Sequence, residues 1–329
     1  MDQKTLTTLE YPRILSALAD QCHFNPAREQ ARELIPSTDL HEVNTLQEET
    51  AEALDLITLH PGITIGGARD LRRIVADAQR GMVLEPNRLL QVKDTLVAAR
   101  NLKRRFYKED WEYPALEVMV QDLPESLGLI SMITRVVSDQ EEILDKASDR
   151  LAQIRNELTT QHSRLKSRMN QLLKKPEVAK HLQETIITQR NGRYVLPIKA
   201  EARTSVPGIV HDQSTSGATL YVEPQSMVDA NNRYRKLELD ERDEVQRILA
   251  ELSSHVAANG DELVELVEVL TRLDLAFARG RYALRINAFR PTIHPFPKKQ
   301  GEGHPGVTLR LFGARHPLLN PQEVVPIDL

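Results

Sequence analysis

The sequence predicts a mainly α-helical protein with one small antiparallel β module. Leucine recurs every seven residues near positions 144–172, in a stretch without glycine or proline. Polar and apolar residues then alternate between positions 184 and 223, and a second long apolar stripe follows. This order predicts a helical core, a long antiparallel coiled-coil pair of helices, and a four-stranded sheet inserted at the tip of that pair.

Residues 1–137 are expected to form the helical core. Apolar residues recur there at helical spacing, in short segments that proline and glycine interrupt. The stretch Gly62–Gly67 is glycine-rich, but no Lys-Ser or Lys-Thr follows it. It is therefore interpreted as a linker between helices and not as a phosphate-binding loop.

The leucine repeat predicts one helix from about Ser138 to Lys175, within an outgoing arm at residues 138–177. Pro176 is expected to end this helix or to begin a further short turn. The repeating residues are Leu144, Leu151, Leu158, Leu165 and Leu172, with Ala147 and Ile154 at intermediate core positions.

Residues 178–225 are expected to form the β module. The sequence Arg-Asn-Gly-Arg at 190–193 is typical of a tight hairpin, because Asn-Gly accepts positive φ angles. Pro197 is expected at an edge position or a bulge. Strands are predicted at 186–188, 194–200, 209–211 and 218–222.

Helical periodicity returns after the β module. A returning arm is predicted at residues 226–259, followed by a core helix at 260–295 that Asn259-Gly260-Asp261 is expected to cap. Residues 296–329 are interpreted as linker and as the first strand region of a truncated domain, with a Pro/Gly-rich linker at Pro291–Gly306.

The charged residues exclude a globally basic protein. Lys and Arg number 43 and Asp and Glu number 47, which gives a net charge of −4. Residues 150–203 nevertheless hold twelve basic and four acidic residues, a local charge of +8. This local charge suits a polyphosphate partner, and a solvated flank of a coiled coil is the alternative. A single cysteine and a start without an apolar stretch predict a cytoplasmic protein without disulfides.

No complete catalytic site can be assembled from the sequence. The motifs of α/β-hydrolases, zinc proteases and nucleotide-binding loops are absent. The run Asp240–Glu244 is interpreted as a solvated helix face, because its carboxylates spread around a helix. No oxyanion hole or orienting partner accompanies His211 and Asp212. No catalytic residue, cofactor site or metal site is therefore predicted in this chain.

Several segments resemble the bacterial MutS-two branch of the MutS family. The resemblance covers nearly the whole chain and implies a helical core, a lever of two helices and a clamp inserted between them. The mismatch-reading domain of the main MutS branch would be missing. The motifs are the Thr8-Leu9-Glu10 start, Arg193–Arg203, Gly208–Leu220, Glu223-Pro224, Asn231-Asn232, Leu273-Asp274 with Phe277-Ala278, and Arg315–Leu318.

The resemblance also implies domains and partners beyond these residues. An ATPase domain and a nuclease-like domain would follow, so the chain is expected to be truncated, and ATP and Mg²⁺ are expected for the full-length protein. Family members are dimeric ATPases that bind branched DNA and suppress recombination, or bind collided ribosomes for rescue. A homodimer with a DNA or ribosomal RNA partner, and no membrane partner, is therefore expected.

Position in the clamp selects the candidate nucleic-acid contacts. They are Arg190, Arg193, Lys199 and Arg203, with Lys174, Lys175 and Lys180 in support and His211 and Ser214 as further candidates. The alternative is a structural module that contacts ribosomal protein or a partner subunit and has no affinity of its own for nucleic acid.

Overall fold

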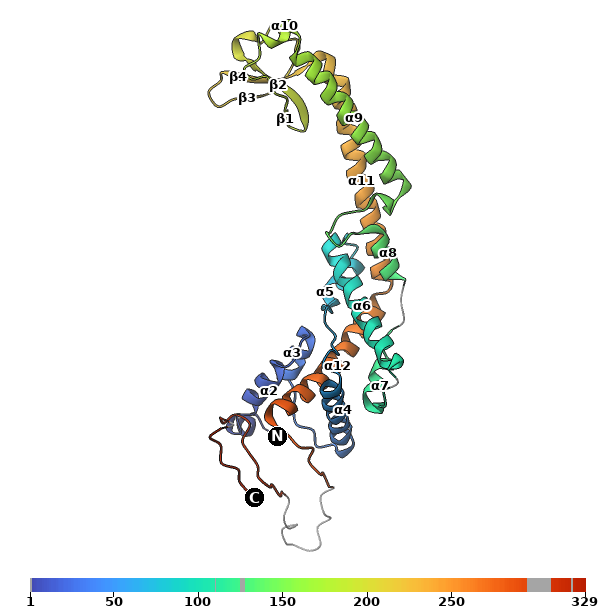
Figure 1. Cartoon of the computed structure of the whole chain (residues 1–329), viewed down its shortest axis with the longest axis vertical. Coiled ribbons are helices and arrows are strands. Elements are labelled where there is room, and N and C mark those ends of the chain that lie inside the picture. Colours follow the sequence, from blue (N-terminus) through green and yellow to red (C-terminus); the bar gives the residue numbers. More distant parts are fainter. Residues whose placement is uncertain (1, 110, 125–127, 295–308, 321) are drawn as a thin grey trace. The chain divides into compact units, whose positions relative to one another are not determined.

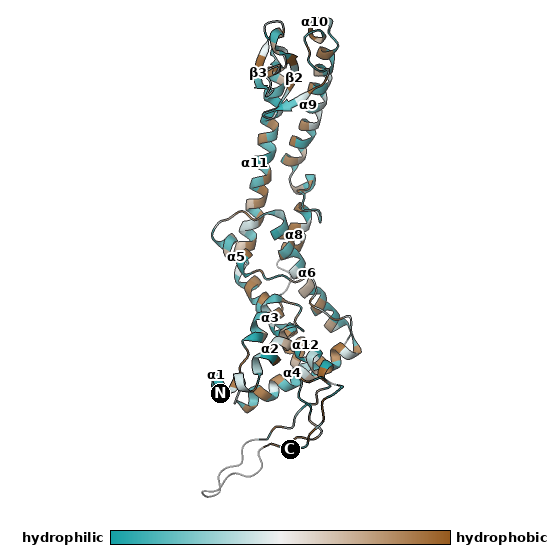
Figure 2. Ribbon diagram, turned by 90° about the vertical axis from the view of Figure 1, so that its left-hand side faces the viewer, coloured by the Kyte–Doolittle hydropathy of each residue, from teal (hydrophilic) through white to brown (hydrophobic). Residues whose placement is uncertain are grey.

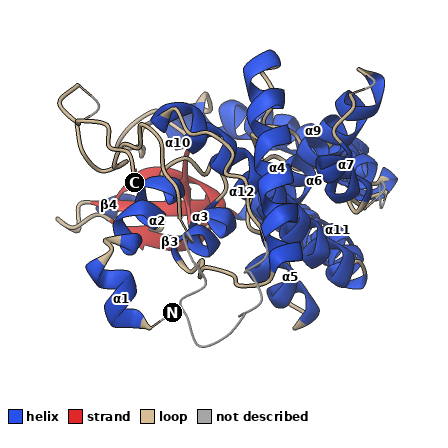
Figure 3. Cartoon of the chain, turned by 90° about the horizontal axis from the view of Figure 1, so that it is seen from below, coloured by secondary structure: helices blue, strands red, loops and turns tan. Residues whose placement is uncertain are grey.

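The computed structural model describes residues 2–109, 111–124, 128–294, 309–320 and 322–329. In this part of the chain, twelve α-helices accompany one four-stranded antiparallel sheet, which confirms the predicted fold class (Figure 3). The chain divides into two compact units, one at residues 1–133 and 253–329 and the other at 134–252. None of the described helices is long and apolar enough to cross a membrane.

The first unit is helical and is organised around α12 (Gly260–Ile286). Gly280 lies so close to α4 that a Cβ atom there would come within 2.9 Å of the backbone nitrogen of Leu54. The Asp274 carboxylate on α12 is fully buried and accepts the backbone N–H groups of His23 and Phe24, each at 2.8 Å. The other helices are α1 (Gln3–Thr8), α2 (Tyr11–Ala19), α3 (Asn25–Arg32), α4 (Leu40–Leu59), α5 (Arg72–Gln79), α6 (Pro86–Lys108) and α7 (Pro114–Gln121).

Several sequence predictions concern the segments between and after the helices of this unit. The Gly62–Gly67 stretch lies between α4 and α5, outside any helix. Asn259 precedes α12 as predicted, but its side chain donates to the His255 carbonyl and does not cap α12. Most of the predicted linker Pro291–Gly306 lies outside the described residues. Near the C-terminal residue, Ala314 and Ile327 form an isolated antiparallel bridge.

In the second unit, the leucine-rich helix is shorter than predicted. Helix α9 runs from Asp149 to Leu173, and α10 (Pro176–Ala179) follows as the short turn that Pro176 allows. The segment between α8 (Leu129–Val136) and α9 contains a bridge and a 3₁₀ turn. Ser148 ends this segment, because its extended backbone and its Oγ, which accepts the Leu151 N–H at 3.0 Å, cap α9. Leu144 therefore lies outside the helix.

The buried positions of α9 also depart from a strict seven-residue repeat. Leu151 and Leu165 are buried, whereas Leu158 and Leu172 are half-buried. Met169 and Leu173 are buried instead, at four-residue steps from Leu165. This end of α9 packs on the sheet. The spacing of its buried residues is therefore that of a helix packed against a globular core and not that of a coiled coil.

Helix α11 (Val228–Ala258) lies beside α9 in the second unit (Figures 1 and 2). Arg155 of α9 donates to Glu241 of α11 at 2.7 Å, and Ser148 donates to Glu244 at 2.8 Å. Glu244 is buried, so the prediction of a fully solvated face at Asp240–Glu244 is wrong at this residue. Hydrogen bonds from Arg247 and Ser148 hold its pKa at about 2, against the opposing effect of burial.

The sheet has the strand order β1-β2-β4-β3, with every pair antiparallel. Its strands are β1 (Thr188–Arg190), β2 (Arg193–Lys199), β3 (Gly208–Gln213) and β4 (Thr219–Pro224). Pro197 lies in an interior strand, but β1 pairs only with residues 193–195 of β2. Pro197, which has no backbone N–H, therefore lies outside the segment that pairs with β1. Its carbonyl accepts the Gln183 N–H instead.

Candidate nucleic-acid interface

The β1–β2 turn has the predicted hairpin geometry and folds over one face of the sheet. Asn191 and Gly192 have φ angles of 49° and 72°. The Arg190 guanidinium carbon lies 4.1 Å from the centroid of the Tyr221 ring, and its Nε lies 3.1 Å from an Asp212 oxygen. Arg190 thus spans from β1 across β4 to β3, and its charge is engaged by an aromatic ring and a carboxylate.

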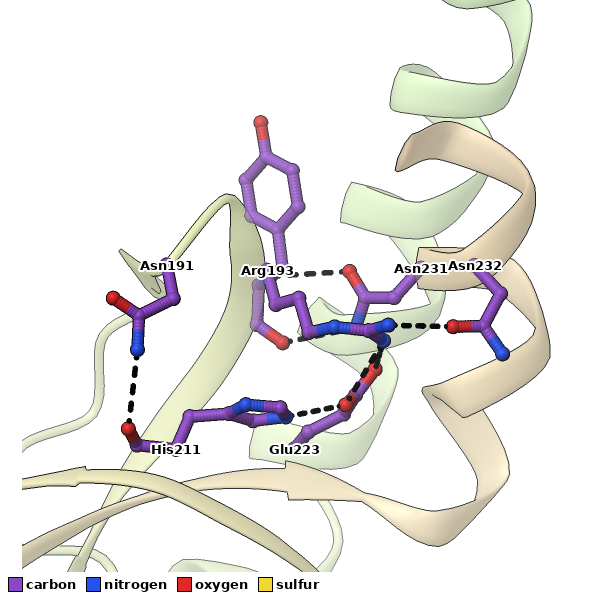
Figure 4. Close-up of polar contacts among 7 residues, drawn as sticks. Asn191, Arg193, His211, Glu223, Asn231 and Asn232 are labelled. Atoms are coloured by element: carbon purple, nitrogen blue, oxygen red, sulfur yellow. Dashed lines mark hydrogen bonds and ion pairs between the residues drawn. The ribbon is translucent and has the colours of Figure 1, made fainter. Parts of the chain in front are cut away.

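A buried carboxylate, Glu223, lies at the centre of the polar contacts beneath this turn (Figure 4). Arg193 Nη1 donates to both Glu223 oxygens, at 2.9 and 3.2 Å, and His211 Nε2 lies 2.6 Å from Oε2. Arg193 Nη2 also donates to Asn232 of α11 at 2.7 Å. A carboxylate without solvent contact requires such partners, so Arg193 and His211 have structural roles here.

Asn231 joins the sheet to α11 through the backbone of β2. Its Oδ1 accepts the Tyr194 N–H at 3.0 Å, and its Nδ2 donates to the Tyr194 carbonyl at 3.1 Å (Figure 4). The described pairing between β2 and β4 ends at Leu196–Val222, and Pro224 ends β4. The Asn231 amide therefore supplies the next pair of ladder bonds in place of a strand.

Gly208 allows β3 to lie close to β4 beside Glu223. A Cβ atom at this position would lie 2.2 Å from the backbone oxygen of Glu223 and 2.8 Å from Val222. The strand β3 also has a bulge at His211, since Val210 pairs with Val222 and Asp212 with Tyr221. The bulge directs His211 toward Glu223.

An apolar core lies on the opposite face of the sheet, against the end of α9. It joins α9, β2, β4 and the start of α11 into one packed body. A half-buried aromatic group of His162, Tyr194 and Tyr234 adjoins it, and burial raises the pKa of Tyr234 to about 12. The buried members are Leu165, Met169, Leu173, Leu182, Leu196, Ile198, Val206, Leu220, Val222 and Met227.

The remaining candidate cations are solvent-accessible. Lys174, Lys175, Lys180 and Arg203 are exposed, and Lys199 is half-buried. In the described part of the chain, none of the five makes an ion pair. The Lys199 N–H donates to the His181 carbonyl at 3.0 Å, which places the end of β2 beside the chain that follows Lys180. The structure therefore brings Lys180 and Lys199 close in the fold.

The nine candidate residues thus fall into two groups. Arg190, Arg193 and His211 are engaged by carboxylates of the sheet, and Ser214 makes the 214–217 turn by accepting the Thr219 N–H at 3.0 Å. The five exposed or half-buried cations remain accessible to a partner. The described residues include no group of three His, Cys, Asp or Glu side chains placed to hold a metal ion.

Sequence reasoning did not recognise the role of Glu223 or of the two asparagines. Glu223 follows Leu220 and Val222 in a strand whose last residues are all buried, and an acidic residue at such a position is a signal for a buried ion pair. Asn231 and Asn232 lie in the first two turns of α11, and the sequence pattern does not show that Asn231 is buried there.

The geometry defines a helical protein in which a small sheet connects two neighbouring helices, α9 and α11. The sheet is joined to α11 by side-chain hydrogen bonds. The chain is 41% identical over 333 residues to the Endonuclease MutS2 of Thermomicrobium roseum and 39% identical over 329 residues to that of Pelotomaculum thermopropionicum. Each alignment covers the whole chain but only 42% and 40% of the relative. No family model matches the chain.

A third relative, the Endonuclease MutS2 of Symbiobacterium thermophilum, is 40% identical over 329 residues. The chain belongs to the MutS2 family. It spans about 40% of the length of the curated relatives it matches.

Proposed function

We propose that this chain is the clamp and lever part of a MutS2-type dimeric ATPase, and that the clamp binds the phosphate backbone of branched DNA or of ribosomal RNA in collided ribosomes. The relatives are named endonucleases, which supports a nucleic-acid partner. ATP and Mg²⁺ would act in a part of the protein outside this chain, and the homodimer would close around the polyanion.

The observation that carries this proposal is a set of cations at residues 174–203 that make no ion pair with any residue the structure describes. Lys174, Lys175, Lys180, Lys199 and Arg203 belong to the end of α9, to the α10 region, and to β2 and the turn after it. In a protein of net charge −4, accessible cations grouped in one module favour a local polyanion contact. Arg190 and Arg193 are assigned to the framework of this surface, because carboxylates already hold them.

A salt titration tests the proposal with the 329-residue chain. Binding to branched DNA, duplex DNA and ribosomes is measured between about 50 and 200 mM salt. We expect a steep loss of affinity with salt, and a shallower slope in the variant Lys174→Ala/Lys175→Ala/Lys180→Ala, because each lost phosphate contact reduces the slope by about one.

A charge-matched control separates local contact from net charge. The variant Lys4→Ala/Arg73→Ala/Lys108→Ala removes three exposed cations from the first unit. It should leave the salt slope unchanged. Equal effects of the two triple variants would contradict a clamp site. Salt-independent binding would instead favour the structural, protein-contacting role.

A further inference from the structure

Two rows of like charge lie on the surface of the first unit, one on α6 and one on α12. The basic row consists of Arg100 and Arg104, and Tyr107, which is 47% exposed, follows on the same helix face. The acidic row consists of Glu265 and Glu268. All four charged side chains are exposed, and none of them forms an ion pair with a residue that the structure describes.

Other arginines of the same two helices do have partners within the unit. Arg88 of α6 pairs with Asp77 at 2.6 Å, and Arg272 of α12 pairs with Asp122 at 3.0 Å. Like charges one helical turn apart repel each other, so each row destabilises its own helix unless an opposite charge approaches it.

The helix dipole does not account for the two rows. It favours cations in the last turn of a helix and anions in the first turn. The last turn of α6 holds Arg105 and Lys108, and the first turn of α12 holds Asp261 and Glu262. The basic and acidic rows lie further inside each helix, beyond the turn in which the dipole acts.

The two rows complement each other in charge and in length. The two arginines are separated by a helical rise of about 6 Å, and the two glutamates by about 4.5 Å. Both rows belong to one compact unit, so a two-fold axis between two copies can repeat the same contact twice. We propose that the basic row of α6 docks on the acidic row of α12 in a second copy of this chain, with Tyr107 as an aromatic anchor beside it. This inference rests on the proposed function for the homodimer and adds a contact made by residues of this chain.

Sedimentation equilibrium of the 329-residue chain, without nucleic acid, tests the contact. We expect a monomer–dimer equilibrium whose dissociation constant rises about tenfold between about 50 and 200 mM salt, because salt screens exposed ion pairs. The variant Arg100→Glu/Arg104→Glu should weaken the dimer by about tenfold or more, because like charges then face each other. The variant Glu265→Lys/Glu268→Lys should have the same effect.

A mixture of the two reversed variants makes the test independent of folding. Their rows complement each other again, so the mixture should form a heterodimer with about the affinity of the unaltered chain. The control Lys4→Glu/Arg73→Glu reverses two other exposed cations of this unit and should leave the dimer unchanged. A monomeric chain at low salt, or a mixture that stays monomeric, would overturn the contact and leave the nucleic-acid proposal standing. Unchanged self-association with weaker nucleic-acid binding by Arg100→Glu/Arg104→Glu would also overturn it and assign the basic row to nucleic acid.

Discussion

The Asn231 side chain completes the hydrogen-bond ladder of β2 by pairing with both backbone groups of Tyr194, at 3.0 and 3.1 Å. Asn231 is buried, so these groups have no access to water in its place. The aromatic contact between Tyr194 and Tyr234 and the bond from Arg193 to Asn232 reinforce the same junction. The sheet is thus joined to α11 by directed polar bonds. In the described residues, by contrast, α9 (Asp149–Leu173) meets the sheet through apolar packing and the His162–Tyr194 ring contact.

Replacing Asn231 should therefore loosen the clamp selectively. We expect Asn231→Ala to lower the free energy of unfolding of the second unit by about 2–3 kcal/mol, because it leaves a buried N–H and a carbonyl unpaired. Amide hydrogen exchange at residues 134–252 would report this unit, while fluorescence of the single tryptophan, Trp111, reports the first. The exposed control Asn170→Ala should change neither signal, and a shift of the Trp111 transition alone would contradict the assignment.

Gly208 should tolerate no side chain. The alanine methyl of Gly208→Ala would lie 2.2 Å from the Glu223 backbone oxygen, so β3 must separate from β4 or the sheet must distort. We expect a loss of about 3 kcal/mol or more in chemical denaturation of the second unit. Gly66→Ala is the matched control, because its methyl would meet only the Thr64 side chain, at 3.4 Å. Similar stability of the two variants would contradict the close strand approach.

Arg193 and Lys199 should respond differently to substitution, although they lie in one strand. Arg193→Ala leaves the buried Glu223 carboxylate with His211 alone, so we expect a loss of about 3 kcal/mol in stability. Lys199→Ala should leave stability within about 0.5 kcal/mol and reduce the salt slope of binding. Together, the two measurements distinguish a residue that stabilises the sheet from a residue that contacts the nucleic acid. A variant at Arg193 that keeps full stability and changes only the salt slope would reverse this assignment.

The sequence predicted the helices, the hairpin and the four strands because each has a local signal. The Asn191-Gly192 turn and the stripe of α12 depend on nearby residues, and the structure confirms both. The predicted start of the leucine-rich helix was wrong, because leucine spacing does not show that Ser148 caps the helix. The buried network was missed because Glu223 meets Arg193 and His211 only after the sheet forms, across up to 30 residues of chain.

The contact of α9 with α11 should depend on pH through Glu244. Its pKa falls from 4.5 to about 2 in the folded protein, since Arg247 and Ser148 donate to the carboxylate. The folded state binds this proton less readily than the unfolded chain does, so the stabilisation is complete above pH 4.5 and declines as the pH falls toward 2. Urea denaturation of the second unit at several pH values should show Glu244→Gln to be less stable than the unaltered chain at pH 7, with the difference shrinking below pH 4.5. A constant gap between Glu244→Gln and the unaltered chain from pH 7 to pH 2 would show that the loss comes from packing and not from the charge of Glu244.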